Sequence, residues 1–147
     1  MDSEFYHKDI FGEVIDLDLL EKEAESDVGP KGKINFNIFS ITEALAERDK
    51  KNAWILYQKA LGAGLTPEEV FWKLVWQVKS LMLASRTKTA EEAGMKSYPY
   101  SKAKSALRNW KEGELENLSR KLVVGYHACR LGEEEMETFV EKVLLSL

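Results

Sequence analysis

The sequence TPEEVFWKLVWQVKSLMLA, from Thr66 to Ala84, decides the fold. It opens with a helix-start signal, because Thr66 can cap free backbone N–H groups, Pro67 fits the first helical position, and Glu69 stands where a capping-box partner belongs. Apolar residues then recur at three- and four-residue spacing and spread well beyond one face: Val70, Phe71, Trp72, Leu74, Trp76, Val78, Leu81, Met82 and Leu83. A helix this apolar must be covered on several sides, so we expect it in the middle of a helical bundle.

The same stretch, at about 19 residues, also has the length of a membrane span. Polar Lys73, Gln77 and Lys79 lie within it and its start is polar, so we predict no membrane span. The acidic N-terminus lacks the apolar segment of a signal peptide, which predicts a cytoplasmic protein. Cys129 is the only cysteine, so neither an intrachain disulfide nor a cysteine-based zinc site is expected.

Sequences on both sides of this helix predict the remaining helices of a bundle. We expect helices at Asn37–Arg48 with Asn35 or Asn37 as cap, Lys50–Leu61 with Asp49 as cap, Thr89–Gly94, Ser97 to Trp110, Glu114–Leu131, and Glu133–Leu147. No alternating apolar run is long enough to predict a strand. The predicted fold is therefore all-α, a bundle of six or seven helices in one domain at residues 33–147.

Residues 1–32 differ in composition from the rest of the chain. Residues 1–27 carry ten acidic side chains against Lys8 and Lys22, and the chain breakers of Gly29–Gly32 follow. Four apolar residues have the spacing of a short helix: Val14, Leu17, Leu20 and Ala24. We predict an acidic N-terminal arm or linker at residues 1–32.

Residues that could support catalysis or bind a metal are not grouped in the sequence. His127 and Cys129 would lie about 200° apart on one helix, so they cannot hold the same ion. Glu133–Glu135 would stand at the start of a helix, where carboxylates complement the helix dipole. Phosphate-binding glycine loops are missing from the sequence, and no nucleophile, base and orienting group can be assembled. We therefore predict no catalytic, metal-binding or cofactor-binding residues, no cofactor, and no enzymatic activity.

A basic stretch is the one pattern that points to nucleic acid. Lys102, Lys104, Arg108 and Lys111 lie in a segment without acidic residues. The last three have helical spacing, which places them on one face, as a phosphate-contacting helix requires. Such stripes are also typical of solvated helix faces, and the net charge of −4 does not favour nucleic acid. Contact of these four residues with nucleic acid therefore remains a hypothesis.

A series of short motifs follows in order from Asn37: Asn37-Ile38-Phe39, Thr42-Glu43-Ala44-Leu45, Asp49, Gly64-Leu65-Thr66-Pro67, Tyr98-Pro99-Tyr100 with Lys102, and Tyr126 to Gly132. Their order and spacing resemble the C-terminal, or collar, domain of the bacterial DNA polymerase III delta subunit, part of the sliding-clamp loader. The resemblance covers about three quarters of the chain. Tyr126 and His127 stand where many relatives have an acidic residue, and Arg130 stands where many have lysine.

The resemblance implies a scaffold role in DNA replication. Collar domains of the loader subunits pack into a ring, and the delta subunit does not hydrolyse ATP. Family members carry two preceding domains of the AAA+ type, so the resemblance implies a collar domain alone, unable to open the clamp by itself. The implied partners are the delta-prime and tau/gamma collar domains, with DNA met only indirectly and without a membrane or small-molecule substrate.

We expect three residues at a subunit interface: Trp72, Trp76 and Arg130. The alternative to a loader subunit is a stand-alone helical module that binds nucleic acid through Lys102–Lys111 or binds another protein. Deep burial of both tryptophans would mean that the bundle alone accounts for them, whereas exposure in an apolar patch would mark a partner site.

Overall fold

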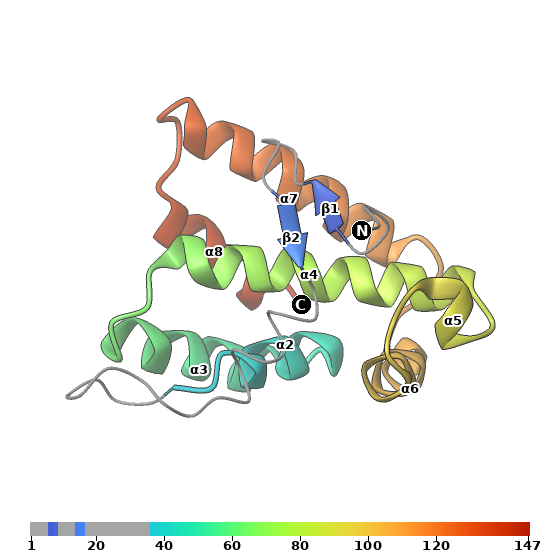
Figure 1. Ribbon diagram of the computed structural model, residues 1–147. Coiled ribbons are helices and arrows are strands. Elements are labelled where there is room, and N and C mark those ends of the chain that lie inside the picture. The colour runs from blue at the N-terminus through green and yellow to red at the C-terminus, as the bar shows by residue number, and fades with distance from the viewer. Residues whose placement is uncertain (1–5, 9–13, 17–35) are drawn as a thin grey trace. The chain divides into compact units, whose positions relative to one another are not determined.

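Helices make up the larger of two units into which the chain divides, Met1–Asn37 and Ile38–Leu147. The computed structural model describes residues 6–8, 14–16 and 36–147 (Figure 1). The described helices are α2 (Phe39–Ala46), α3 (Lys50–Gly62), α4 (Pro67–Arg86), α5 (Ala90–Ala93), α6 (Ser97–Ala106), the 3-10 turn η2 (Leu107–Asn109), α7 (Glu114–Arg130) and α8 (Met136–Leu145). Within residues 36–147 the predicted all-α fold, with six or seven helices, is confirmed.

Helix α4 lies in the middle of the bundle, as its sequence predicts. It contacts α2, α5, α6, α7 and α8, and Figure 1 shows it running between α7 on one side and α2 on the other. No residue from Val70 to Ala84 is exposed, and the side chains of Val70, Leu74 and Leu81 are completely buried. One face of the helix is thus fully buried and the rest of this stretch is at least half-buried, which gives the helix the apolar environment that its composition requires.

The start of α4 has the predicted capping box. The hydroxyl oxygen of Thr66 accepts a hydrogen bond from the Glu69 N–H at 3.2 Å, and the Glu69 carboxylate accepts one from the Thr66 N–H at 2.7 Å. Asp49 likewise caps α3 by accepting from the Asn52 N–H at 3.2 Å. Each bond satisfies a backbone donor that has no partner within the helix.

Other helix ends differ from the sequence-based expectation. Helix α2 starts at Phe39 after Ile38, without a side-chain cap, so the predicted cap at Asn37 is wrong; Asn35 lies outside the described residues. Helix α8 starts only at Met136, so Glu133–Glu135 precede its first turn instead of forming it. Gly132 has a positive φ of 77° and turns the chain between α7 and α8, which delays the start of the last helix.

The described part of the N-terminal unit is a short antiparallel pair of strands, β1 (Tyr6–Lys8) and β2 (Val14–Asp16), with Tyr6 opposite Asp16. The predicted helical spacing from Val14 therefore does not correspond to a helix at this point. β-Branched Val14 and Ile15 favour extended backbone. Leu17, Leu20 and Ala24, the other positions of that pattern, lie outside the described residues.

The outer helices α3 and α8 are joined by a buried tyrosine. Tyr57 of α3 is fully buried, and its hydroxyl donates a hydrogen bond to the Glu137 carbonyl oxygen at 2.9 Å. Burial, with Glu137 and Glu141 nearby, raises the pKa of Tyr57 well above its ordinary value. The hydroxyl therefore stays protonated and keeps its role as donor.

Helices α7 and α8 approach closely at Gly125. A Cβ atom at this position would lie 2.0 Å from two ring atoms of Phe139, a residue of α8 that is itself buried. Such a distance is far inside van der Waals contact, so the ring or the helix would have to move. The absence of a side chain at Gly125 is what lets the two helices meet over the aromatic ring.

We expect Gly125→Ala to destabilise the protein by about 1–3 kcal/mol, because it overpacks a rigid ring. Gly62→Ala is the matched control, since a Cβ there meets no atom within 4 Å and its φ is not positive. The control should be neutral or stabilising by about 0.4–1 kcal/mol. Urea denaturation of both variants measures the difference, and equal stability of the two would contradict the close approach of α7 and α8.

Candidate interaction surfaces

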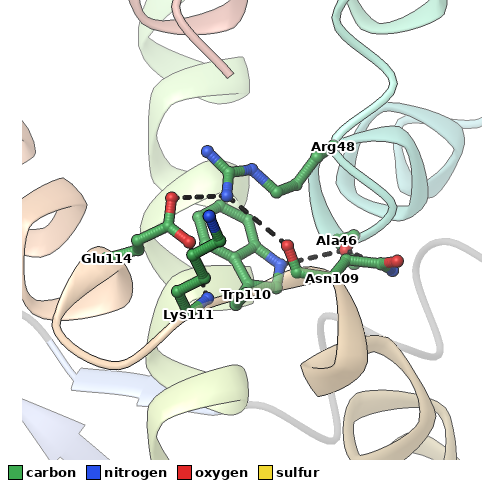
Figure 2. A network of polar contacts seen from close by, with 6 residues as sticks. All are labelled: Ala46, Arg48, Asn109, Trp110, Lys111 and Glu114. Carbon is green, nitrogen blue, oxygen red and sulfur yellow. Dashed lines mark hydrogen bonds and ion pairs between the residues drawn. The ribbon is translucent and has the colours of Figure 1, made fainter.

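A network of polar contacts connects the turn between α2 and α3 with the segment between α6 and α7 (Figure 2). Arg48 donates to the Glu114 carboxylate at 2.5 Å and to the Asn109 carbonyl oxygen at 3.4 Å. Its guanidinium also lies 4.5 Å from the centre of the Trp110 ring. The Trp110 indole N–H donates to the Ala46 carbonyl oxygen at 3.0 Å. Segments more than sixty residues apart in the chain are thus joined by one side chain and its neighbours.

Arg48 holds this position in a backbone conformation that is rare for a residue with a side chain. Its φ is +57°, in the left-handed region, at the turn that separates α2 from α3. Only glycine adopts this region without cost, and another residue loses about 1–2 kcal/mol. The ion pair with Glu114 and the contact with Trp110 offset that strain. In the sequence, the sign of this network is the position of Arg48, a cation directly before Asp49, the residue that caps α3.

Glu114, at the first position of α7, completes the network. Its carboxylate accepts the Lys111 backbone N–H at 2.6 Å and the Arg48 guanidinium, and these two contacts hold the pKa of Glu114 below its ordinary value. The side chain remains 30% exposed, so water weakens the ion pair. The network therefore orients the Trp110–Lys111 segment more than it stabilises the bundle.

The predicted single basic face is not formed. Helix α6 ends at Ala106, Arg108 lies in η2, and Lys111 follows in the turn before α7. Trp110 has extended backbone, which breaks the helical spacing on which the prediction depended. The chain turns here because the Trp110 indole N–H donates a hydrogen bond to the Ala46 carbonyl oxygen. This contact joins distant segments of the chain, so helical periodicity in the sequence does not reveal it.

Two of the four predicted basic residues are engaged within the bundle. Lys102 pairs with Glu43 of α2, and this hydrogen bond raises the pKa of the Lys102 ammonium group. Lys104 donates to the Thr87 carbonyl oxygen at 2.6 Å, just beyond the end of α4, and Tyr100 donates to the same oxygen at 3.0 Å. A cation at a helix C-terminus complements the helix dipole. Lys102 and Lys104 therefore have structural partners, whereas Arg108 and Lys111 are exposed.

The two tryptophans expected at an interface are half-buried. Trp72 packs against Tyr126 of α7 with ring centres 5.2 Å apart, and Trp76 packs edge-on against Phe39 of α2 at 5.2 Å. The bundle thus accounts for part of each ring. Arg130, the third expected interface residue, is exposed in the last turn of α7.

The candidate metal and thiol residues do not form a site. His127 is exposed and Cys129 is half-buried on α7, and burial, followed by Glu134 and Glu68, raises the pKa of the Cys129 thiol. A raised pKa leaves less of the reactive thiolate. Across the described residues, no three His, Cys, Asp or Glu side chains are arranged to hold a metal ion. In the same part of the chain, no helix has both the length and the apolar character needed to cross a membrane.

The outer face of α7 carries exposed apolar residues that sequence analysis missed. Val123, Val124 and Leu131 are 51%, 63% and 61% exposed. The signal was available, because a helix that buries Leu115, Leu118, Leu122 and Gly125 must turn Val124 away from the core.

Comparison of the chain with protein families, with curated proteins and with solved structures finds no match in any of the three.

The strain at Arg48 gives a direct test. Arg48→Gly and Arg48→Ala both lose the contacts with Glu114 and Trp110, but only alanine retains the unfavourable left-handed conformation. We expect Arg48→Ala to be less stable than Arg48→Gly by about 1 kcal/mol in urea denaturation. Indistinguishable stabilities would contradict a left-handed backbone at this turn.

The lowered pKa of Glu114 predicts a pH-dependent stability. Because the folded-state pKa lies below the unfolded value of about 4.3, the contribution of Glu114 is complete above that value and is lost as the pH falls through the folded pKa. Thermal unfolding from pH 7 to pH 3 should therefore show that the stability advantage of the unmodified protein over Glu114→Gln shrinks in acid.

The control for this pH dependence is Glu116→Gln, which removes the same charge from the same helical turn and leaves the contacts with Arg48 and Lys111 intact. Its own ion pair with Arg86, at 3.7 Å between exposed side chains, contributes little to stability. If Glu116→Gln showed the same shrinking advantage, net charge would be the cause, and the assignment to the Glu114 contacts would be wrong.

Proposed function

We propose that this chain is a non-catalytic oligomerisation and scaffold domain of the DNA polymerase III clamp loader, of the delta-subunit collar type. The observation that carries the proposal is the agreement between motifs and helices. Thr42–Leu45 lies within α2, Gly64–Pro67 leads into α4, Tyr98–Tyr100 opens α6, and Tyr126–Gly132 closes α7. Three of these four motifs thus lie where this bundle starts or ends a helix, and the fourth lies inside α2.

The bundle has physical properties that suit a scaffold. Its central helix is contacted by five neighbouring helices, so the outer faces are available for other subunits without exposing the fully buried core residues. A standard interface needs roughly 800 Å² from each partner. Half-buried Trp72 and Trp76 have the residue type that most often anchors such interfaces. The proposed partners are the delta-prime and tau/gamma collar domains, and the proposed setting is the cytoplasm.

The test is assembly from purified components. The full chain, mixed with delta-prime and tau/gamma subunits, should elute from size-exclusion chromatography as a complex whose mass, measured by light scattering, includes all of them. Elution of the chain by itself at concentrations of about 10 μM would contradict the proposal, since assembly interfaces of this size hold more tightly than that.

DNA binding separates this proposal from the stand-alone nucleic-acid module. The scaffold should have little affinity for duplex DNA in fluorescence anisotropy at physiological salt. Binding that weakens steeply with salt and is lost in Lys104→Glu/Arg108→Glu would favour the nucleic-acid module instead. Arg108→Glu alone is the cleaner variant, because Lys104 also contacts the end of α4.

A further inference from the structure

The outer side of α7 carries exposed valines between two charges of opposite sign. Val123 and Val124, in the middle of the helix, are 51% and 63% exposed. Glu116, with 44% of its side chain exposed, lies near the start of the helix, and Arg130, also exposed, is its last residue. We call Glu116, Val123, Val124 and Arg130 the α7 seam. One exposed apolar side chain is normal on a protein surface, but two adjacent ones bounded by charges have the composition of a contact surface.

The two charges of the α7 seam are placed symmetrically about Val123. Glu116 precedes Val123 by seven residues, and Arg130 follows it by seven. Seven residues are nearly two helical turns, so the three side chains lie on one line that drifts by about 20° at each step. Each charge stands about 10 Å from Val123 along the helix axis. The order along the seam is therefore negative, apolar and positive, at equal spacing.

Both charges have contacts within one copy of the chain and can take a further partner. Glu116 forms an ion pair with Arg86 at 3.7 Å, and because both side chains are exposed the pair is weak. Arg130 has an interaction within its own chain. A guanidinium group carries five N–H donors, so it can serve a second acceptor. Glu134, four residues beyond Arg130, pairs with Lys142 at 2.7 Å. The seam thus offers one carboxylate and one guanidinium group, and neither has to be unsatisfied in the single chain.

We propose that two copies of this chain pair through the α7 seam, with their α7 helices antiparallel and Val123 of each at the two-fold axis. A two-fold interface uses the same patch of both copies. Rotation about an axis through Val123 brings Glu116 of each copy opposite the partner's Arg130. Val123 meets the partner's Val123 at the centre, with Val124 beside it. The interface then has an apolar centre and a charged rim, which is the usual arrangement of a protein–protein contact.

The two signs of charge favour a second copy over other occupants. Duplex DNA would bring phosphate groups against Glu116. An acidic partner helix would repel Glu116, and a basic one would repel Arg130. A parallel pair of copies would bring like charges together at both ends. The seam needs a partner in which the two signs come in the reverse order, and a two-fold rotation of the seam itself supplies that order.

We expect the dimer to be weak and dependent on concentration. Its contacts come from one helix of each copy, and its ion pairs lie at an exposed rim, where water and salt reduce their strength. Sedimentation equilibrium of the full chain from about 5 to 500 μM should show a mass that rises from one chain towards two. A mass of one chain at every concentration would overturn the proposal.

Charge reversal tests the antiparallel register. Glu116→Arg and Arg130→Glu, made singly, each place like charges opposite one another at both ends of the seam, and each should weaken dimerisation roughly tenfold or more. The double variant Glu116→Arg/Arg130→Glu restores both ion pairs with the signs exchanged and should dimerise within about threefold of the unmodified chain. The two positions are about 21 Å apart along one helix, so they can rescue one another only between copies.

Two further variants complete the test. Lys51→Glu makes the same reversal of charge as Arg130→Glu at an exposed position of α3, and it should leave dimerisation unchanged. Val123→Ser keeps every charge and removes apolar contact at the centre, so it should weaken dimerisation by at least roughly threefold. Thermal unfolding checks that each variant is folded, and Val123→Ser keeps the proposal testable where a charge-reversed variant is not.

Two further results would overturn the proposal. These are unchanged dimerisation in both single charge reversals, and a double variant that dimerises no better than either single one. The inference goes beyond the proposed function and does not rest on it, because pairing of identical chains requires no loader subunit. Assembly with delta-prime and tau/gamma subunits by a chain that stays monomeric alone would keep the proposed function and remove the α7 dimer. A dimer that does not assemble with those subunits would do the reverse.

Discussion

The need to cover α4 on several sides is the constraint on which the rest of the structure depends. A twenty-residue helix with apolar side chains on every face is stable in water only when other elements surround it. Helices α2, α5, α6, α7 and α8 supply that cover, and all of them except the four-residue α5 contribute buried apolar residues of their own. The order of the outer helices follows from this requirement, since short connections must bring each one back to the same central helix.

Polar contacts then join the outer helices to one another at the margins of the core. Tyr57 joins α3 to α8, and Arg48 joins the α2–α3 turn to the segment before α7. Because each of these side chains bonds to backbone oxygen atoms of a distant segment, they specify which segments meet more than they add stability. The positive φ of Arg48 is tolerated for the same reason, as the network holds the turn from both sides.

The surfaces available to partners are those that the core does not use. Lys102 and Lys104 are engaged in the bundle, so the basic stretch contributes less free charge than the sequence indicates. The outer face of α7, by contrast, carries three of the exposed large apolar side chains among the described residues, Val123, Val124 and Leu131. The engagement of Lys102 and Lys104 arises from contacts between residues far apart in the chain, which helical periodicity does not contain, whereas the exposure of Val124 follows from the spacing of the buried residues of α7.

By itself, the sequence determined the fold class, the central place of α4 and the caps at Thr66 and Asp49, because these depend on spacing and on side chains within three residues of the backbone they satisfy. Tertiary structure alone decided that α6 ends before Arg108 and that Lys104 donates to the carbonyl oxygen just beyond the end of α4. The physical reason is range: local hydrogen bonds act within one helical turn, whereas the path of the chain at Trp110 follows from its hydrogen bond to Ala46.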